Sequence, residues 1–264
     1  MKNESNLEGT HDLFSAKTVE DIAVLSLNEQ LLLRATDLEA KGSLFDYFER
    51  ISKSDVIKVV LIIGSPEKSG REEYIRFYSQ LAQSGFPYGV VERFYNAVSQ
   101  YILKLVDFNK LVVHADSGNV ISLFMNASLA CDYRIIGDNT VFQNVYLDLG
   151  LVPKGGGSFF LSRMLGFSKT LEILSRKEIT AKEALKLGIV DKVVPVMALN
   201  ETALGIAKGF AQQPACSLSG IKKLLRSCMK ELEDCLECEN RLLAQIVKTQ
   251  DFRNSLLNHT ENSL

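Results

Sequence analysis

The sequence predicts a mixed α/β fold, and two observations support this expectation. Short apolar runs rich in β-branched residues, typical of buried strands, alternate with stretches of helical periodicity. The C-terminal part, from 203 to 257, has an almost wholly helical pattern. Alternating strands and helices indicate a sheet covered by helices. A helix-only end indicates a cap or an oligomer-forming arm.

The expected elements follow one another along the chain. Strands are expected at 22–27, 56–63, 110–115, 133–136 and 189–194. Helices are expected at 36–52, 71–83, 91–105, 123–131, 155–165, 168–174 and 180–187. Because residues 1–15 are mostly polar, we expect a loose leader there. An α/β core over 16–200 and a helical region over 201–264 then complete the chain.

Composition narrows the function classes. Hydrophobic residues make up 46% of the chain, enough for a substantial core, and the net charge of −2 gives no basic field that would attract nucleic acid. No apolar run reaches the roughly 20 residues of a membrane span. The sequence contains no metal-ligand cluster. Cys235 and Cys238 have CxxC spacing, but they lie in a helical pattern without a second pair, which favours free thiols in a cytoplasmic protein.

Four spaced motifs occur in order between residues 110 and 222. The first comprises Lys110, Gly118, Cys131 and Asp132, and the second comprises Phe142, Gly150, Pro153, Gly156 and Gly157. The third comprises Ala181, Glu183, Ala184, Gly188, Val190, Val193, Val194 and Pro195, and the fourth comprises Pro214, Ala215 and Lys222. With these motifs the chain resembles the crotonase superfamily, the enoyl-CoA hydratase/isomerase family, over roughly residues 20–255.

The resemblance implies a crotonase-type spiral of ββα units with a C-terminal helical region, assembled as a homotrimer or homohexamer. It implies an acyl-CoA or acyl-carrier-protein thioester as ligand, without a further cofactor. Two backbone N–H groups, at Arg71 and Leu123 by register, would hold the thioester oxygen as negative charge develops on it. The resemblance also implies that an exposed Lys222, and less strongly Lys68, contacts CoA phosphates.

The sequence departs from the family at its catalytic positions. Where the family has two carboxylates, this chain has Asn126 and Tyr146. An amide cannot exchange a proton at neutral pH, and a phenol has an unperturbed pKa of about 10. Tyr146 could donate a hydrogen bond to an enolate, or it could simply fill space. The family's glycine triplet is replaced by 122–124 (Ser-Leu-Phe), which either reshapes the oxyanion hole or abolishes it.

Three other polar residues are candidates for proton transfer. Asp148 lies two residues after Tyr146, and an Asp at that offset occurs in the dienoyl-CoA isomerase branch of the family. It could instead be a loop or helix-cap carboxylate. His114 and Asp116 lie in or just after a buried strand, and alternation puts both on one side. They could form a catalytic pair or a structural polar contact.

We therefore expect an acyl-thioester hydratase or isomerase with noncanonical site chemistry. One alternative is a decarboxylase of the polyketide-cassette type, because the segment SGREEYIRFY is similar to that branch at Tyr74, although Tyr78 stands at its lysine position. The other alternative is a non-catalytic member that binds CoA or only assembles. The sequence does not specify the acyl group.

Overall fold

The main feature of the fold is a seven-stranded sheet. The computed structural model describes residues 7–28, 31–34, 36–65, 70–85, 87–227, 229 and 231–261. The sheet comprises, in spatial order, β1 (Gly9–Thr10), β2 (Phe14–Val19), β3 (Ile22–Leu27), β4 (Val59–Ile63), β5 (Leu111–Asp116), β7 (Tyr133–Gly137) and β10 (Lys192–Val194). Strands β1, β2 and β3 pair antiparallel, whereas β3, β4, β5, β7 and β10 pair parallel. The α/β fold is confirmed.

A second, smaller sheet consists of β6 (Asn119–Ile121), β8 (Val141–Gln143) and β9 (Glu178–Thr180). The helices before it are α1 (Leu31–Arg34), α2 (Leu38–Lys53), α3 (Arg71–Gln83) and α4 (Tyr88–Asp107). The later helices are α5 (Ser122–Ser128), α6 (Gly157–Leu165), α7 (Phe167–Leu174), α8 (Ala181–Lys186), α9 (Leu199–Ala211), α10 (Ala215–Arg226), α11 (Leu232–Ile246) and α12 (Gln250–Glu261). Two short 3-10 helices are η1 (Val145–Leu147) and η2 (Val196–Ala198).

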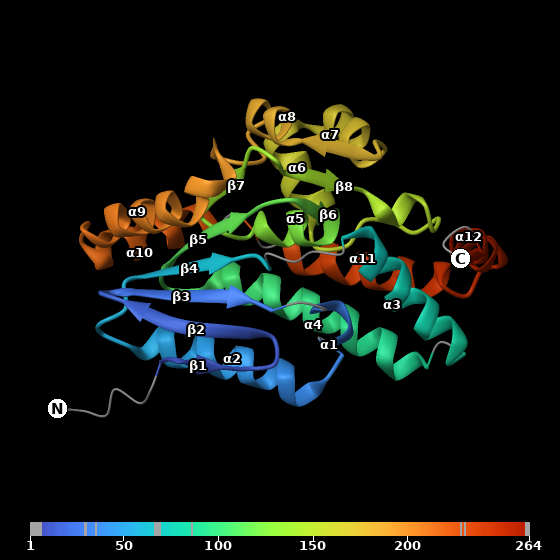
Figure 1. The fold of residues 1–264 in the computed structure, drawn as a ribbon, viewed down its shortest axis with the longest axis horizontal. Coiled ribbons are helices and arrows are strands. Elements are labelled where there is room, and N and C mark those ends of the chain that lie inside the picture. Colours follow the sequence, from blue (N-terminus) through green and yellow to red (C-terminus); the bar gives the residue numbers. More distant parts are fainter. Residues whose placement is uncertain are drawn as a thin grey trace.

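Strand alternation divides the core between the two faces of the main sheet. Val113 and Ala115 of β5 pack with the apolar side of α9 on one face. Val112 belongs to the larger core on the other face, together with residues of α2, α4 and α5. Because successive side chains point to opposite faces, His114 and Asp116 share the side of Val112. Figure 1 shows α2 and α4 on one side of the strands and α9 near their other side.

The C-terminal helices pack partly on the chain itself. Leu243 of α11 and Phe252 of α12 are fully buried in a second cluster that includes aromatic residues of α3 and α4. Figure 1 shows α11 running along α4, and α12 lying near the end of α3. In contrast, Leu224 and Leu225 of α10 are 74% and 69% exposed. Part of the apolar surface of the helical region is therefore covered within the chain and part is not.

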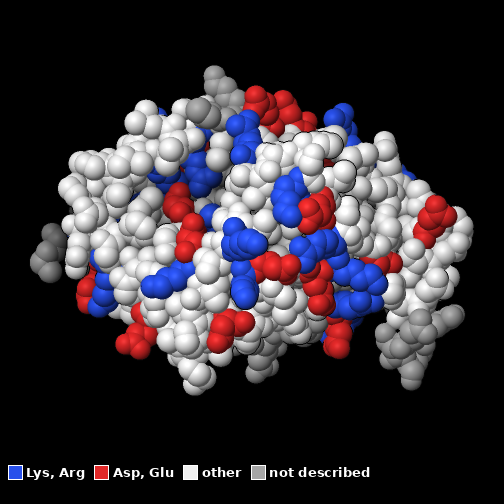
Figure 2. All heavy atoms as spheres, turned by 90° about the horizontal axis from the view of Figure 1, so that it is seen from above, with Lys and Arg blue, Asp and Glu red and all other residues white. Residues whose placement is uncertain are grey.

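Residues 7–15, the described part of the expected loose leader, contain regular structure. β1 and the first residues of β2 lie within this part, and Phe14 is fully buried. The pairing of β2 with β3 provides the physical reason, because each residue from 14 to 19 has a partner in β3. On the face seen in Figure 2, basic and acidic side chains lie side by side in mixed clusters. None of the described helices is long and apolar enough to cross a membrane.

Candidate active site

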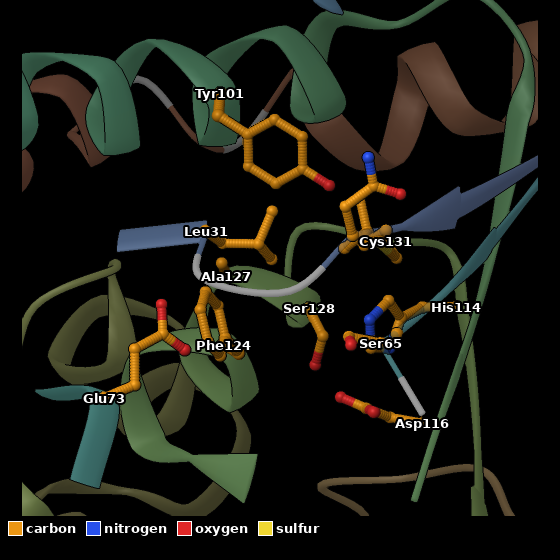
Figure 3. Close-up of a pocket in the computed structure, with 13 residues that line it drawn as sticks. Leu31, Ser65, Glu73, Tyr101, His114, Asp116, Phe124, Ala127, Ser128 and Cys131 are labelled. Atoms are coloured by element: carbon orange, nitrogen blue, oxygen red, sulfur yellow. The ribbon is translucent and has the colours of Figure 1, made fainter. Parts of the chain in front are cut away.

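A small cavity lies where β3, β4 and β5 end, between the sheet and α5. Its volume is about 50 Å³. Its lining residues come from the loop ends of the strands, from α1, α3, α4 and α5: Leu27, Asn28, Leu31, Gly64, Ser65, Glu73, Tyr101, His114, Asp116, Phe124, Ala127, Ser128 and Cys131. Ligands of α/β proteins commonly bind at the carboxyl ends of parallel strands. This cavity, which Figure 3 shows in close-up, is therefore the candidate active site.

Glu73 brings a buried carboxyl group to the cavity. It lies in the first turn of α3 and is only 7% exposed. One carboxylate oxygen accepts a hydrogen bond from the N–H of Leu32, at 2.9 Å. Burial raises the pKa of Glu73, while the Leu32 N–H and the charge of Arg76 oppose the shift. A carboxyl group with a raised pKa can both hold and release a proton nearer to neutral pH.

His114 and Asp116 reach the same cavity from β5. They are 7% and 4% exposed, and both line the cavity as alternation along the strand requires. One oxygen of Asp116 accepts a hydrogen bond from the N–H of Ser117 at 2.9 Å. In Figure 3, Ser65 and Ser128 lie beside this pair, and Glu73 approaches from the opposite side. The cavity therefore combines an imidazole with two carboxyl groups.

The two helices that carry the expected oxyanion donors begin close together. Gly70, which precedes α3, has a φ of 47° and lies against β6: a Cβ on Gly70 would be 3.3 Å from the carbonyl oxygen of Asn119. β6 leads directly into α5, which starts at Ser122. Arg71 is thus the first residue of α3 and Leu123 the second residue of α5. N–H groups in the first turn of a helix have no partner within the helix, and the helix dipole favours negative charge there.

Asn126 lies away from this cavity, beneath the glycine turn before α6. Its side chain is fully buried, and its amide group donates to the carbonyl oxygen of Lys154 at 2.9 Å. A Cβ on Gly157 would lie only 2.4 Å from the Cγ of Asn126, so that only glycine fits above this side chain. Asn126 is not among the lining residues. In this structure it fills space and anchors the turn.

Tyr146 also points elsewhere. Its side chain is 4% exposed and belongs to the apolar cluster of α3, α4 and α12, and its hydroxyl donates to the carbonyl oxygen of Leu174. Burial raises the pKa of Tyr146 well above its ordinary value, so the phenol stays protonated. These contacts favour the space-filling interpretation of Tyr146.

Asp148 forms an ion pair instead of lining the cavity. One of its oxygens lies 2.7 Å from the guanidinium of Arg71. A second nitrogen of Arg71 lies 3.2 Å from Nδ1 of His259, and Nε2 of His259 lies 3.1 Å from the backbone oxygen of Asp148. The three residues connect the start of α3, the end of η1 and α12. The structure thus separates Asp148 from the pair His114 and Asp116.

Lys222 is buried, so the expectation of an exposed lysine is wrong. Its side chain is 3% exposed, and Nζ donates to Asp132 at 2.7 Å and to the backbone oxygen of Lys110 at 2.9 Å. Asp132 also accepts from Arg226 and from the N–H of Val112. The family-like lysine therefore joins α10 to the start of β5. Lys68 lies outside the described residues.

The comparisons with known proteins agree with this fold. The chain belongs to the family described as Enoyl-CoA hydratase/isomerase, which matches residues 17–263. A short-chain-enoyl-CoA hydratase of Clostridium acetobutylicum is 23% identical over 239 residues, which are 89% of each chain. The fatty acid oxidation complex subunit alpha of Shewanella loihica is 40% identical over 119 residues, which are 43% of this chain but only 17% of that protein.

The solved structures include an enoyl-CoA hydratase from Bacillus halodurans. Its TM-score is 0.77 at 20% identity, covering 94% of this chain and 100% of that chain. The crotonase-type fold that the motifs implied is therefore confirmed.

The sequence reasoning missed Glu73, although the sequence contains a signal for it. Tyr74, Phe77, Tyr78 and Leu81 form the buried side of α3. Glu73 lies four residues before Phe77, so it belongs to that side and not to the solvent-facing side. A carboxylate on the apolar side of a helix needs a partner or a function.

Proposed function

We propose that the protein is an acyl-thioester hydratase or isomerase in which Glu73, together with His114 and Asp116, transfers the proton. The observation that supports this most is that a buried carboxyl group with a raised pKa lies in one small cavity with a buried imidazole and a second carboxyl group. The cavity also adjoins the starts of α3 and α5, where the family places its thioester. The ligand is an acyl-CoA or an acyl-carrier-protein thioester.

In the proposed reaction the thioester oxygen accepts hydrogen bonds from the N–H groups of Arg71 and Leu123. A base in the cavity removes a proton from the carbon next to the carbonyl. The C–H electron pair forms the new carbon–carbon double bond, and the carbonyl π electrons move to the oxygen, where the donors stabilise them. Return of the proton to another carbon completes an isomerisation. In a hydration the base instead takes a proton from water, whose oxygen bonds to the β-carbon. The C=C π electrons then shift toward the thioester to give the same enolate, and the α-carbon takes up a proton.

The side-chain environment explains why Glu73 is a better base than the residues at the usual positions. Asn126 has no acidic proton and is held under Gly157. Tyr146 is a phenol whose pKa is raised further by burial. Asp148 is a carboxylate that the sequence suggested near these positions, but the guanidinium of Arg71 already pairs with it. An ion-paired carboxylate is a weaker base than an unpaired one because the positive charge stabilises its ionised form.

The decisive experiment compares two carboxyl-to-amide variants, Glu73→Gln and Asp148→Asn. The substrates are crotonyl-CoA, 3-butenoyl-CoA, butyryl-CoA and malonyl-CoA, with hydration, isomerisation, exchange of the α-proton in D₂O and decarboxylation as readouts. We expect Glu73→Gln to lower turnover by about 10²–10⁴-fold with little change in CoA affinity. Asp148→Asn should retain most of the activity.

The other outcomes distinguish the alternatives. Loss of activity in Asp148→Asn alone would return the catalytic role to Asp148. Turnover of malonyl-CoA alone would support the decarboxylase, which the described contacts do not favour because Tyr74 and Tyr78 lie in the aromatic cluster. Binding without any turnover would support the non-catalytic alternative. Robust hydration of crotonyl-CoA by Glu73→Gln would refute the proposed site.

We also propose a homo-oligomer, a trimer or a hexamer, in the cytoplasm. Its support is the apolar surface that the chain leaves uncovered, which includes Ile221, Leu224 and Leu225 on α10 and Phe167 and Leu171 on α7. Phe167 is 78% exposed, although large apolar side chains are usually covered when they lie together on a surface. Sedimentation of a stable monomer at micromolar concentration would contradict this proposal.

A further inference from the structure

Two neighbouring cavities share one wall. Beside the polar cavity of about 50 Å³ lies a second cavity of about 110 Å³. The second cavity is lined almost wholly by apolar side chains from β3, α1, α2, α4 and α5. Five residues line both cavities and therefore form the wall between them: Leu27, Leu31, Tyr101, Phe124 and Ala127.

Phe124 is the wall residue at which this chain departs from the glycine triplet that the family resemblance implies. It is the third residue of α5. Glycine there would contribute no side chain to either cavity. In Figure 3 the phenyl ring of Phe124 lies between Glu73 and Ser128, at the boundary of the polar cavity. The size of the polar cavity therefore depends on this ring.

The volumes indicate what each cavity can hold. A single water needs roughly 10–15 Å³ by this kind of measure, and an apolar cavity of about 150 Å³ holds benzene. The polar cavity has room for a short acyl group only, whereas the apolar cavity could take several further methylene groups. Because apolar groups gain about 0.8 kcal/mol per buried methylene, access to it would raise affinity roughly 4-fold per methylene.

We propose that Phe124 determines acyl-chain length: its ring closes the apolar cavity to the ligand and restricts the protein to short acyl groups. This inference rests on the proposed function, since it assumes that the acyl group occupies the polar cavity. The ring acts as a barrier between two adjoining cavities and not as the end of one cavity. Removal of the ring therefore joins two existing cavities.

The test measures the affinity of acetyl-, butyryl-, hexanoyl- and octanoyl-CoA by titration calorimetry for three proteins. These are the unmodified protein, Phe124→Ala, and Phe45→Ala as a matched control. Phe45, on α2, lines only the apolar cavity, so its removal enlarges that cavity and leaves the wall intact. Phe124→Leu, which opens the wall partly, serves as a second variant should Phe124→Ala fail to fold.

We expect the affinity of the unmodified protein and of Phe45→Ala to stop rising, or to fall, beyond butyryl-CoA. For Phe124→Ala we expect it to rise by up to roughly 4-fold per added methylene as far as hexanoyl- or octanoyl-CoA. Unchanged chain-length preference in both Phe124 variants, or the same gain in Phe45→Ala, would overturn the inference alone. If none of the proteins bound any acyl-CoA more tightly than free CoA, the inference and the proposed function would fail together.

Discussion

Glu239→Ala is expected to destabilise the protein strongly, because this carboxylate holds the turn that supports α5. Glu239 lies on α11 and is 5% exposed. Its oxygens accept from the N–H groups of Gly155 and Gly156, each at 3.0 Å. Oε2 also lies 3.5 Å from Nζ of Lys154, a residue that is 4% exposed. The glycine turn, whose N–H groups suit an anion, is thus occupied by a carboxylate of the chain itself.

The size of the expected loss in free energy of unfolding follows from the buried groups that Glu239→Ala leaves without a partner. Removing one partner of a buried ion pair typically costs about 3–5 kcal/mol, because the other charge stays buried without compensation. The N–H groups of Gly155 and Gly156 also lose their acceptor, and a buried donor without a partner costs about 1–3 kcal/mol. Because these groups share one site, the costs are not additive. We expect a loss of about 3–5 kcal/mol, a large part of the 5–15 kcal/mol typical of a domain.

Urea denaturation at fixed protein concentration measures this loss of stability. A double-mutant cycle with Lys154→Met shows how much of the loss comes from the interaction between Glu239 and Lys154. The double variant should be more stable than Glu239→Ala alone, because it leaves no unpaired ammonium. Gly155 lies against α5, since a Cβ there would be 3.0 Å from the carbonyl oxygen of Leu123. Acyl-CoA affinity should therefore fall together with stability. A loss below about 1 kcal/mol, or strictly additive effects in the cycle, would refute this reasoning.

Three further predictions concern charged groups near the site. Lys222→Met should lower the denaturation midpoint because it breaks the 2.7 Å contact with Asp132. The same variant should leave CoA affinity at low salt unchanged. A selective loss of CoA affinity in the folded variant would instead support a phosphate contact. Burial raises the pKa of Glu73, so the folded state binds this proton more tightly than the unfolded state. The stabilising contribution of this bound proton to folding is therefore fully present below the unfolded pKa of about 4.3, and it is lost as the pH rises through the folded pKa. Glu73→Gln should consequently gain stability relative to the unmodified protein between pH 4 and 8, as measured by urea titrations. Asp148→Asn should weaken the pairing with Arg71 and increase hydrogen exchange in α12, and unchanged exchange would show that apolar contacts alone hold this helix.

The regular elements of the core could be predicted because their pattern is local. The strand expected at 22–27 and the helix expected at 71–83 coincide with β3 and α3. The small sheet was missed because β6, β8 and β9 have three residues each, too few for a period to show. β1 and β2 were missed because β2 is recognisable mainly by its pairing with β3. Pairing is a long-range property that a local pattern does not contain.

Two lining residues of the candidate cavity were predictable from the sequence, whereas the surroundings of Glu73 and Lys222 were not. Alternation along β5 placed His114 and Asp116 on one side, and the structure brings both to the cavity. The direction of Glu73 depends on the N–H of Leu32, which lies 41 residues away in the sequence. The burial of Lys222 depends on Asp132, which lies 90 residues away. A motif identifies such a residue but does not specify its partner.

The surroundings of Asn126 explain why no carboxylate stands at the family's first position. The amide group of Asn126 donates to the carbonyl oxygen of Lys154, and its own oxygen has no hydrogen-bond partner among the described residues. A carboxylate there would face a carbonyl oxygen without a donor, and burial of an unpaired charge is costly. Glu73, in contrast, receives the N–H of Leu32 and lies near the charge of Arg76. In this chain an ionisable carboxyl group is therefore sustainable on α3 but not at the usual place on α5, and this difference favours α3 as the source of the proposed base.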